Sequence, residues 1–506
     1  MSLASTLDVP RPTPGATPPP LGAARTGASA AALPIFAALW AIATLFHHAA
    51  YPRSAFAPVA LLVTLPAVWL LLRPRAPGRL VLLAGAQLLQ VAWLGPSWVS
   101  NHWLLTAAVN LAIVGAALWL ALGTRRGGGG VGTGGPPRLD GGALFAAFAP
   151  AARLTLLVLY FYGVFQKLNT DYLDPASSCA TWQYGQILAK YPFLPSGAWM
   201  GYLAIYGTLV IEALIAVLLV VRRTRVAGVL LGGVFHAMLA LNPSWVFYDF
   251  TSALLALYFL FVPLDYLAER RAGGAAGVAP GWLRLGARGA RAALVVLALG
   301  LAAAAALGVR PSTPFHVNAL QEAARVAFFA YFAVLLAVFG GAARRTDVAA
   351  RTAALVRFVP RPALLALAPL LFFANGLAPY VGLKTEASIA MFSNLRTEQG
   401  RTNHLLMGWV PRVAGYQDDV VRVIASTDSE LARFGRRGLL LPYYEFQARA
   451  ARHPGASVTY ERNGRRFAVA RIGDDPALGA PPPRWQRAYL RFRAFEPWDV
   501  PQRCRH

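Results

Sequence analysis

The chain has 506 residues, of which 57% are hydrophobic and 14% are charged, and this usage excludes an ordinary soluble globular protein. Its mean hydropathy is +0.48, and its apolar runs of about 17–23 residues suit a bilayer core of about 30 Å. The net charge of +25 does not indicate nucleic-acid binding, since no nucleic-acid motif accompanies it and the arginines lie mainly between apolar runs. We therefore predict a polytopic membrane protein with no nucleic-acid partner.

The N-terminal segment is expected to be disordered. Residues 1–32 are rich in proline, alanine and glycine and contain no apolar core, which is typical of a flexible tail. No small-residue cleavage site follows the apolar run 33–50, so we predict that this run is a retained membrane span and not a signal peptide.

Apolar runs between charged or Pro/Gly breaks predict about eleven membrane spans, a count that the short and proline-containing runs leave open by one or two. Residues 33–265 form a predicted membrane core, and three further spans follow within residues 292–380. The runs are 33–50, 55–72, 80–95, 102–122, 145–165, 198–221, 226–241, 245–262, 292–308, 323–339 and 364–380.

Two glycine-rich segments between the runs are predicted to be linkers. Residues 127–135, GGGGVGTGG, lack the Lys-Ser/Thr pair and the strand-to-helix setting of a phosphate loop. Residues 266–291 are a second linker of the same kind, which we assign to the cytoplasmic side.

The distribution of basic residues predicts the orientation of the bundle. With the N-terminus in the cytoplasm, the inner segments carry twenty arginines. This strong positive-inside bias predicts a plasma (inner) membrane protein with a cytoplasmic N-terminus and an extracytoplasmic C-terminal domain. The outer segments carry only Arg53, Lys167, Lys190, Arg310 and Arg325.

The composition changes after residue 380, where the chain becomes polar. Residues 381–506 show strand-like alternation at 457–460, 466–471 and 487–495, and Asn463-Gly464 predicts a hairpin over 458–472 with a two-residue turn. The predicted fold class is an all-α membrane bundle with a small α/β extracytoplasmic domain, which is large enough for one modest core.

The chain has two cysteines, Cys179 in an outer segment and Cys504 near the C-terminus. Both are predicted on the oxidising side of the membrane, where a pair of thiols tends to be joined. We predict a Cys179–Cys504 disulfide. The alternative is two unrelated thiols, since the sequence does not show whether their alpha carbons lie within about 7 Å.

Titratable residues inside the predicted spans are few, and most share one depth. Such groups are costly to bury in a membrane and mark sites more often than chance. Glu212 is the exception, because we place it deeper, toward the inner side. The residues near the outer ends of their spans are His47, His48, His102, Lys167, His236 and Asp249.

Each of these residues also has a structural interpretation. His47 and His48 would be interfacial histidines that need only water as a partner, and Asp249 would cap its helix. Glu212 would be a hydrogen-bond partner between helices or a member of a proton relay. The shared depth of the group instead favours a polar pocket beneath the outer domain.

Three short motifs carry a resemblance to a known family. The segments YFYGVFQKLNTDYLD around Lys167, SNHWLL around His102 and GVFHAMLAL around His236 resemble segments of the horizontally transferred transmembrane (HTTM) family, to which the vitamin K-dependent gamma-carboxylase belongs. The resemblance covers residues 33–265. Trp103 departs from the family's less bulky residue, and the part after the last span is shorter than the large lumenal portion of the well-studied enzyme.

The resemblance implies a chemistry for these residues. Lys167 would be the base that deprotonates a reduced vitamin K or related quinol, His102 would assist the addition of carbon dioxide, and His236 would line the quinone pocket; no metal is predicted. A lysine acts as a base at neutral pH only when it is buried away from carboxylates. Asp171 would hold the proton of Lys167 if the helix continued through it, and less so if the helix ends near Asn169.

A polar segment, GLKTEASIAMFSNLRTEQGRTNHLL, follows the last span at residues 382–406. Its Arg396, Arg401 and His404, together with Asp249, are the candidates for binding a carboxylate-bearing substrate, since forked guanidinium groups suit a carboxylate. The alternative is a salt-bridged surface of a docking domain.

Three functions remain open. The first is a quinol-dependent membrane enzyme of the carboxylase or epoxidase type, a lyase-type activity. The second is a non-catalytic scaffold or maturation factor of the same superfamily, whose polar pocket holds a membrane lipid or a helix partner. A transporter is less favoured, because neither repeats nor pairs of broken helices are evident. The sequence leaves the oligomeric state open.

Overall fold

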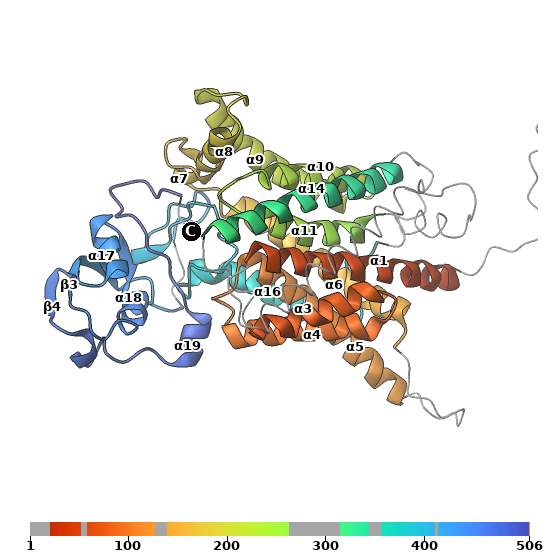
Figure 1. Cartoon of the computed structure of the whole chain (residues 1–506), viewed down its shortest axis with the longest axis horizontal. Helices are drawn as coiled ribbons and strands as arrows, with labels where there is room; N and C mark the ends of the chain where they lie inside the picture. The colour runs from red at the N-terminus through yellow and green to blue at the C-terminus, as the bar shows by residue number, and fades with distance from the viewer. Residues whose placement is uncertain are drawn as a thin grey trace, which may run out of the picture.

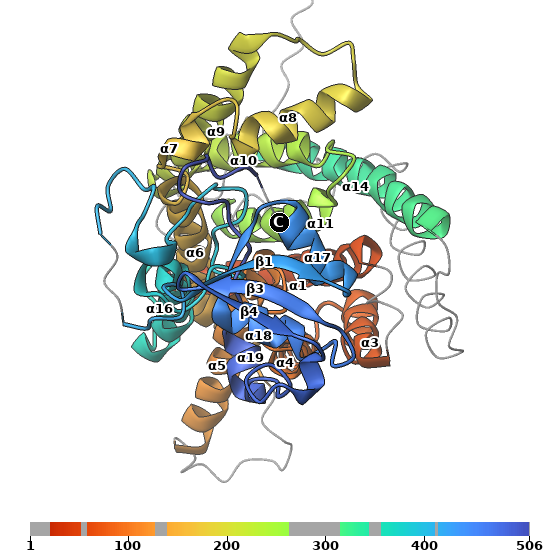
Figure 2. The same cartoon turned by 90° about the vertical axis from the view of Figure 1, so that its left-hand side faces the viewer.

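The computed structural model describes residues 21–51, 58–126, 139–262, 314–343, 356–409 and 413–504. Figure 1 shows a bundle of long helices and, at one end of it, a small domain built from the C-terminal residues. We call the end of the bundle that contacts this domain the domain end. Figure 2, viewed from the domain end, shows the small domain in front of the helices, with α7 (Thr170–Leu173), α8 (Cys179–Lys190) and α9 (Ala198–Val220) to one side.

Helices make up nearly all of the bundle. Between α6 and α9 the chain forms two short helices, α7 (Thr170–Leu173) and α8 (Cys179–Lys190). The other helices of the bundle are α1 (Leu21–Ala50), α3 (Pro58–Leu72), α4 (Pro77–Leu94), α5 (Asn101–Arg126), α6 (Gly141–Phe165), α9 (Ala198–Val220), α10 (Arg225–Leu239), α11 (Phe247–Tyr258), α14 (Pro314–Ala343) and α16 (Leu367–Leu377).

Seven of the described helices are long and apolar enough to cross a membrane, and three shorter apolar helices accompany them. These ten segments overlap ten of the eleven predicted spans. The predicted span 292–308 and the predicted linkers at 127–135 and 266–291 lie outside the described residues. The length and composition of the helices thus indicate a membrane-embedded protein.

The first helix begins earlier than expected. α1 starts at Leu21, whereas the sequence predicted a disordered tail as far as residue 32. Residues 21–32 contain six alanines, and alanine has the highest helix propensity of the common residues. The composition that suggested disorder therefore extends the helix in this part of the chain.

Aromatic and hydrogen-bonded side chains fill the centre of the bundle. Phe36 and Trp40 of α1 stack with their ring centroids 5.4 Å apart. Trp40 Nε1 donates to Asn110 Oδ1 at 2.9 Å, and Gln87 Nε2 donates to Thr44 Oγ1 at 2.8 Å. Such bonds join α1, α4 and α5 where no water is present to satisfy polar groups.

The C-terminal domain is built on a four-stranded antiparallel sheet in the order β2-β1-β3-β4. Two helices, α17 (Ser429–Arg436) and α18 (Tyr443–Ala450), contribute to its core through buried residues such as Leu431 and Phe446. The strands are β1 (Val420–Ser426), β2 (Leu440–Pro442), β3 (Val458–Arg462) and β4 (Arg465–Val469).

The structure confirms the predicted hairpin. β3 and β4 pair as far as Arg462 and Arg465, which leaves Asn463 and Gly464 as a two-residue turn. These two residues have φ values of 53° and 71°, as a type I′ turn requires.

The third predicted strand, at residues 487–495, does not form. Its first residues belong to helix α19 (Arg484–Tyr489), and its last residue makes an isolated bridge between Phe495 and Leu440. α19 lies against the connection between α4 and α5, where Ser97 N donates to Ala488 O at 3.0 Å. Contact with the bundle therefore decides the conformation of this stretch, and an alternating pattern does not report such contacts.

Candidate functional site

Lys167 lies in a turn at the domain end, just after α6 ends at Phe165. Its Nζ atom donates to Oε2 of Glu212 on α9, and the two side chains form an ion pair in which each is 10% exposed. Asn169 then caps α7, because its Oδ1 accepts from Tyr172 N at 2.8 Å. The chain thus changes direction at Lys167, and the lysine reaches sideways to another helix.

The condition expected of a lysine base, burial away from carboxylates, is not met, because Glu212 and not Asp171 holds the ammonium group of Lys167. α6 ends before Asp171, so Lys167 and Asp171 do not lie on consecutive turns of one helix. Glu212 Oε2 also lies beside Gly163 of α6, four residues before Lys167, so the lysine side chain reaches back toward α6 to meet this carboxylate. The deeper position of Glu212 stays a prediction.

A pocket lies beside this ion pair. Lys167 and Glu212 line it together with Tyr160 and His236, and most of the remaining wall is apolar. A mostly apolar pocket with a few convergent polar groups is usual for a small-molecule site. The aromatic residues of the wall include Tyr172, Phe247, Phe250 and Phe392.

His236 joins the pocket to a chain of hydroxyl groups. Its Nε2 lies 2.9 Å from Tyr160 Oη, which is hydrogen-bonded in turn to Tyr258 Oη. The other ring nitrogen, Nδ1, is buried and has no hydrogen-bond partner among the described residues. An unsatisfied buried polar atom is costly, so a ligand that bonds to this nitrogen would be stabilised.

The loop at residues 387–399 has an unusual backbone. Five of its non-glycine residues have positive φ, among them Ile389 at 63° and Phe392 at 54°. This region is costly for a β-branched residue such as isoleucine, and Asn101 Oδ1 supports it by accepting from Ile389 N at 2.6 Å. Because Ile389 and Phe392 line the pocket, the strained backbone forms part of its wall.

The turn around Lys167 packs against the polar segment that follows the last span. Thr170 N donates to Asn403 O at 3.0 Å, and Leu405 N donates to Leu168 O at 2.9 Å. The two polar stretches singled out in the sequence therefore form one unit at the domain end.

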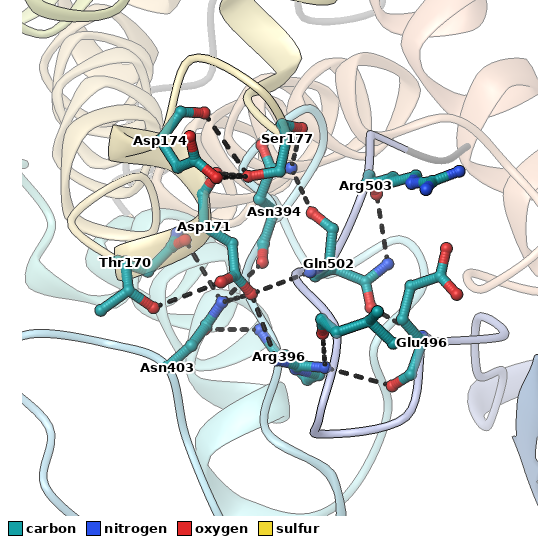
Figure 3. Close-up of polar contacts among 12 residues, drawn as sticks. Thr170, Asp171, Asp174, Ser177, Asn394, Arg396, Asn403, Glu496, Gln502 and Arg503 are labelled. Atoms are coloured by element: carbon teal, nitrogen blue, oxygen red, sulfur yellow. Dashed lines mark hydrogen bonds and ion pairs between the residues drawn. The ribbon is translucent and has the colours of Figure 1, made fainter.

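Asp171 lies at the centre of this unit (Figure 3). Its Oδ2 accepts from Asn403 Nδ2 at 2.8 Å and from Gln502 N at 3.1 Å, and it forms an ion pair with Arg396 Nη2 at 3.4 Å. Arg396 is only 4% exposed, and its contacts fit the salt-bridged alternative better than substrate binding. Its Nη1 also donates to the carbonyl oxygens of Glu496, Pro497 and Val500.

His404 is also engaged within the protein. Its Nε2 donates to Phe165 O at 2.7 Å, and its Nδ1 accepts from the backbone nitrogens of Leu406 and Met407 at 3.1 and 3.2 Å. Burial lowers the pKa of His404 below its ordinary value, against the opposing effect of the bond to Phe165. A neutral ring suits one donating and one accepting nitrogen. Arg401, in contrast, is exposed.

A second polar cluster joins three helices at the domain end. His47 Nδ1 and His102 Nε2 lie 2.9 and 2.6 Å from the same Oδ2 atom of Asp249. Asp249 is the third residue of α11 and does not cap it, so the capping alternative is wrong. The interpretation that His47 and His48 need only water as a partner is also wrong, because His47 bonds to Asp249, and His48 is 4% exposed and lies 2.6 Å from Thr64 Oγ1.

Phe250 lies between the two clusters. Its ring centroid is 5.8 Å from that of His102 and 5.3 Å from that of His236. The predicted catalytic residues therefore divide: Lys167 and His236 share one pocket, and His102 lines a neighbouring pocket with which the first shares a wall at Phe247 and Phe250.

The structure confirms the predicted disulfide. Cys179 and Cys504 are bonded, and their alpha carbons are 4.7 Å apart. Cys179 is the first residue of α8 and lines the pocket beside Lys167. The bond thus ties the C-terminal tail to the pocket wall.

Sequence reasoning missed Tyr160, and it predicted Glu212 as a hydrogen-bond partner between helices without naming Lys167 as the donor. A carboxylate inside an apolar span needs a cationic or hydrogen-bonding partner, and this was a usable signal for pairing Glu212 with Lys167. Tyr160 precedes Lys167 by seven residues, which is two helical turns. That spacing could have indicated that both side chains reach one pocket.

Lys384 is a buried lysine whose effect on stability should depend on pH. Its side chain is 7% exposed and its Nζ donates to Ser97 Oγ at 3.3 Å, and burial lowers the pKa of Lys384 to about 8. Below pH 8 the folded protein must keep the charged ammonium group of Lys384 buried, which costs free energy. Lys384→Met removes this cost, so it should raise the free energy of unfolding below pH 8 by up to about 3 kcal/mol. The gain should vanish as the pH rises to about 10.5, where the unfolded chain also loses this proton.

Thermal unfolding of the two forms from pH 6 to pH 10.5 measures this effect. Lys190→Met is the matched control, because the Lys190 side chain is 35% exposed and its replacement should change stability little at any pH. A Lys384→Met variant that is less stable than the wild type below pH 8 would contradict the prediction.

Comparison of the chain with protein-family models, with curated proteins and with solved structures finds no match. The function must therefore be inferred from the chemistry of the two clusters. These clusters are the Lys167–Glu212 pair with His236, and the His47–Asp249–His102 group.

Proposed function

We propose that this protein is a membrane enzyme that binds a reduced quinone beside Lys167 and removes the proton of one of its hydroxyl groups. The observation that carries the proposal is the Lys167–Glu212 ion pair in an apolar pocket that His236 also lines. Titratable groups within a membrane bundle mark functional sites by default. The resemblance of three motifs to the HTTM family supports the same assignment.

The pocket suits the chemistry of a quinol. A quinol presents a flat apolar ring with hydroxyl groups at two ends, and Phe247 and Phe250 provide apolar surface for such a ring. The Lys167–Glu212 pair would bind one hydroxyl group. The buried Nδ1 atom of His236, which lacks a partner among the described residues, would bond to the other.

Removal of the proton requires a neutral amine at Lys167. When the ion pair transfers one proton internally, Lys167 becomes an amine and Glu212 a carboxylic acid. Lys167 then accepts the hydroxyl proton, and the ligand oxygen keeps the electron pair of the broken O–H bond.

The ammonium group that forms at Lys167 stays beside the new anion and stabilises it in a site of low dielectric constant. The bound quinol supplies the electrons for the reaction that the family resemblance implies, in which the quinol and O₂ give an epoxide and water. We leave carboxylation out of the proposal, because three of the four residues predicted to bind a carboxylate substrate are engaged within the protein. These are Asp249, Arg396 and His404.

The proposal also places the domain end outside the cytoplasm, in the plasma (inner) membrane. The positive-inside distribution of arginines supports this orientation. The Cys179–Cys504 bond supports it too, because disulfides persist mainly in oxidising compartments.

Lys167→Ala is expected to lower the rate of epoxide formation at least about 100-fold, because a positioned base contributes about 10²–10⁴-fold to a rate. The full chain in lipid nanodiscs would be incubated with a reduced naphthoquinone and oxygen, and the epoxide measured by mass spectrometry. Lys190→Ala is the matched control, since Lys190 lies outside the pocket and pairs with Glu322 at 3.4 Å.

A scaffold or maturation factor is the second candidate function. The observation that favours it is that Glu212 holds the ammonium group of Lys167, as in a purely structural ion pair. Absence of turnover in the wild type would contradict the enzyme and favour the scaffold. Turnover that persists in Lys167→Ala would contradict only the assignment of Lys167 as the base, and the protein would still be an enzyme.

A further inference from the structure

We propose that His47, His102 and Asp249 bind a divalent first-row transition-metal ion, at a site separate from the quinol pocket. Their potential ligand atoms, His47 Nδ1, His102 Nε2 and Asp249 Oδ2, all lie within 4.8 Å of one another. Ligand atoms at about 2.0–2.2 Å from a zinc-like ion stand about 3–4 Å apart. The three side chains therefore need only small movements to surround one ion.

The donor set selects the class of ion. Two imidazoles and one carboxylate, with further positions open, suit Fe²⁺, Co²⁺ or Zn²⁺. Mg²⁺ and Ca²⁺ prefer oxygen ligands alone. The three residues come from α1, α5 and α11, so an ion bound here would link three helices that are far apart in the chain.

The charge and burial of Asp249 support the proposal. Asp249 is 2% exposed, and a buried carboxylate is retained where it is paired or coordinates a metal. Both imidazoles approach one oxygen of this carboxylate, and a cation among the three groups would replace the protons that join them. Trp103 stacks on His47 with the ring centroids 3.7 Å apart and an interplanar angle of 10°, and this packing holds the plane of the His47 ring.

The cluster has access and room for an ion. His47 lines one hollow and His102 lines its neighbour, and Tyr51 and Ser100 line both. A separate cavity of about 10 Å³ borders His102 and Asp249, which is about the space that one water molecule needs. A water ligand there could complete the coordination of the ion.

Titration with Co²⁺ tests the site directly. The full chain, purified in detergent with a tag that contains no histidine, would be stripped with a chelator and titrated while the visible absorption bands of bound Co²⁺ are followed. We expect about one equivalent to bind, Zn²⁺ to displace it and Mg²⁺ to leave it in place. His102→Ala and Asp249→Asn should each weaken binding by more than about 100-fold, since loss of an outer partner alone weakens metal binding by about 10–100-fold.

His48→Ala is the matched control. It removes the neighbouring histidine of the same helix, whose ring bonds to Thr64 outside the cluster, and it should bind Co²⁺ as the wild type does. Circular dichroism and gel filtration would identify variants that fail to fold. If the variants do not fold, the wild-type titration alone decides whether the protein binds the metal ion. No binding by the wild type, or equal binding by folded Asp249→Asn, would overturn the proposal.

Discussion

Replacing Glu212 by leucine is expected to lower the free energy of unfolding by about 3–5 kcal/mol, because it leaves the Lys167 ammonium group buried without its carboxylate. Lys167→Met should have a similar effect, since it leaves the carboxylate of Glu212 unpaired. The double variant Lys167→Met/Glu212→Leu should recover most of the stability, because apolar side chains of similar volume suit an apolar pocket. Unfolding of the four forms by SDS in mixed micelles gives the interaction energy of the pair.

The exposed pair of Lys190 and Glu322 provides the control for this cycle. Its side chains are 35% and 49% exposed, so Lys190→Met should change stability by less than about 1 kcal/mol. A double variant no more stable than the single variants would show that other groups depend on the Lys167–Glu212 pair.

The same four proteins distinguish the two proposed functions. The enzyme requires both the amine of Lys167 and the carboxylate of Glu212 that takes its proton, so all three variants should lose epoxide formation even where stability returns. A scaffold requires only the folded bundle, so its function should return in the double variant along with the stability.

The bundle could be predicted because an apolar run is a property of the local sequence. Ten of the eleven predicted spans overlap described helices, and the Asn463-Gly464 turn fixed the hairpin because its left-handed backbone is also a local requirement. The predictions that failed concern segments whose conformation depends on tertiary contacts. Residues 487–495 alternate like a strand, but contact between α19 and Ser97 decides their conformation.

The site was only partly predictable for a related reason. A common depth in the membrane brought Lys167 and His236 to one pocket, and depth can be estimated from position along an apolar run. The rotation of each helix and the offset between helices decide which side chains touch, and the apolar runs do not contain this information. The contacts of Glu212 with Lys167 and of His47 with Asp249 depend on both.

Loss of the Cys179–Cys504 bond is expected to lower the free energy of unfolding by about 2–5 kcal/mol. The two cysteines are 325 residues apart in the chain, and a cross-link that closes a long loop removes much freedom from the unfolded state. Cys504→Ser, Cys179→Ser and the double variant should lose the same amount, because each removes one and the same bond. Chemical reduction should destabilise the wild type and leave the double variant unchanged.

The position of the bond predicts where the loss appears first. Cys504 follows Gln502, whose backbone nitrogen donates to Asp171, and Asp171 belongs to the short helix beside Lys167. Without the bond, the tail should leave this carboxylate more often, and hydrogen exchange should rise at residues 170–179 and 496–504 while the cores of α6 and α11 stay protected. Unchanged exchange in these segments would show that the hydrogen bonds of Asp171 and Arg396 hold the tail without the disulfide.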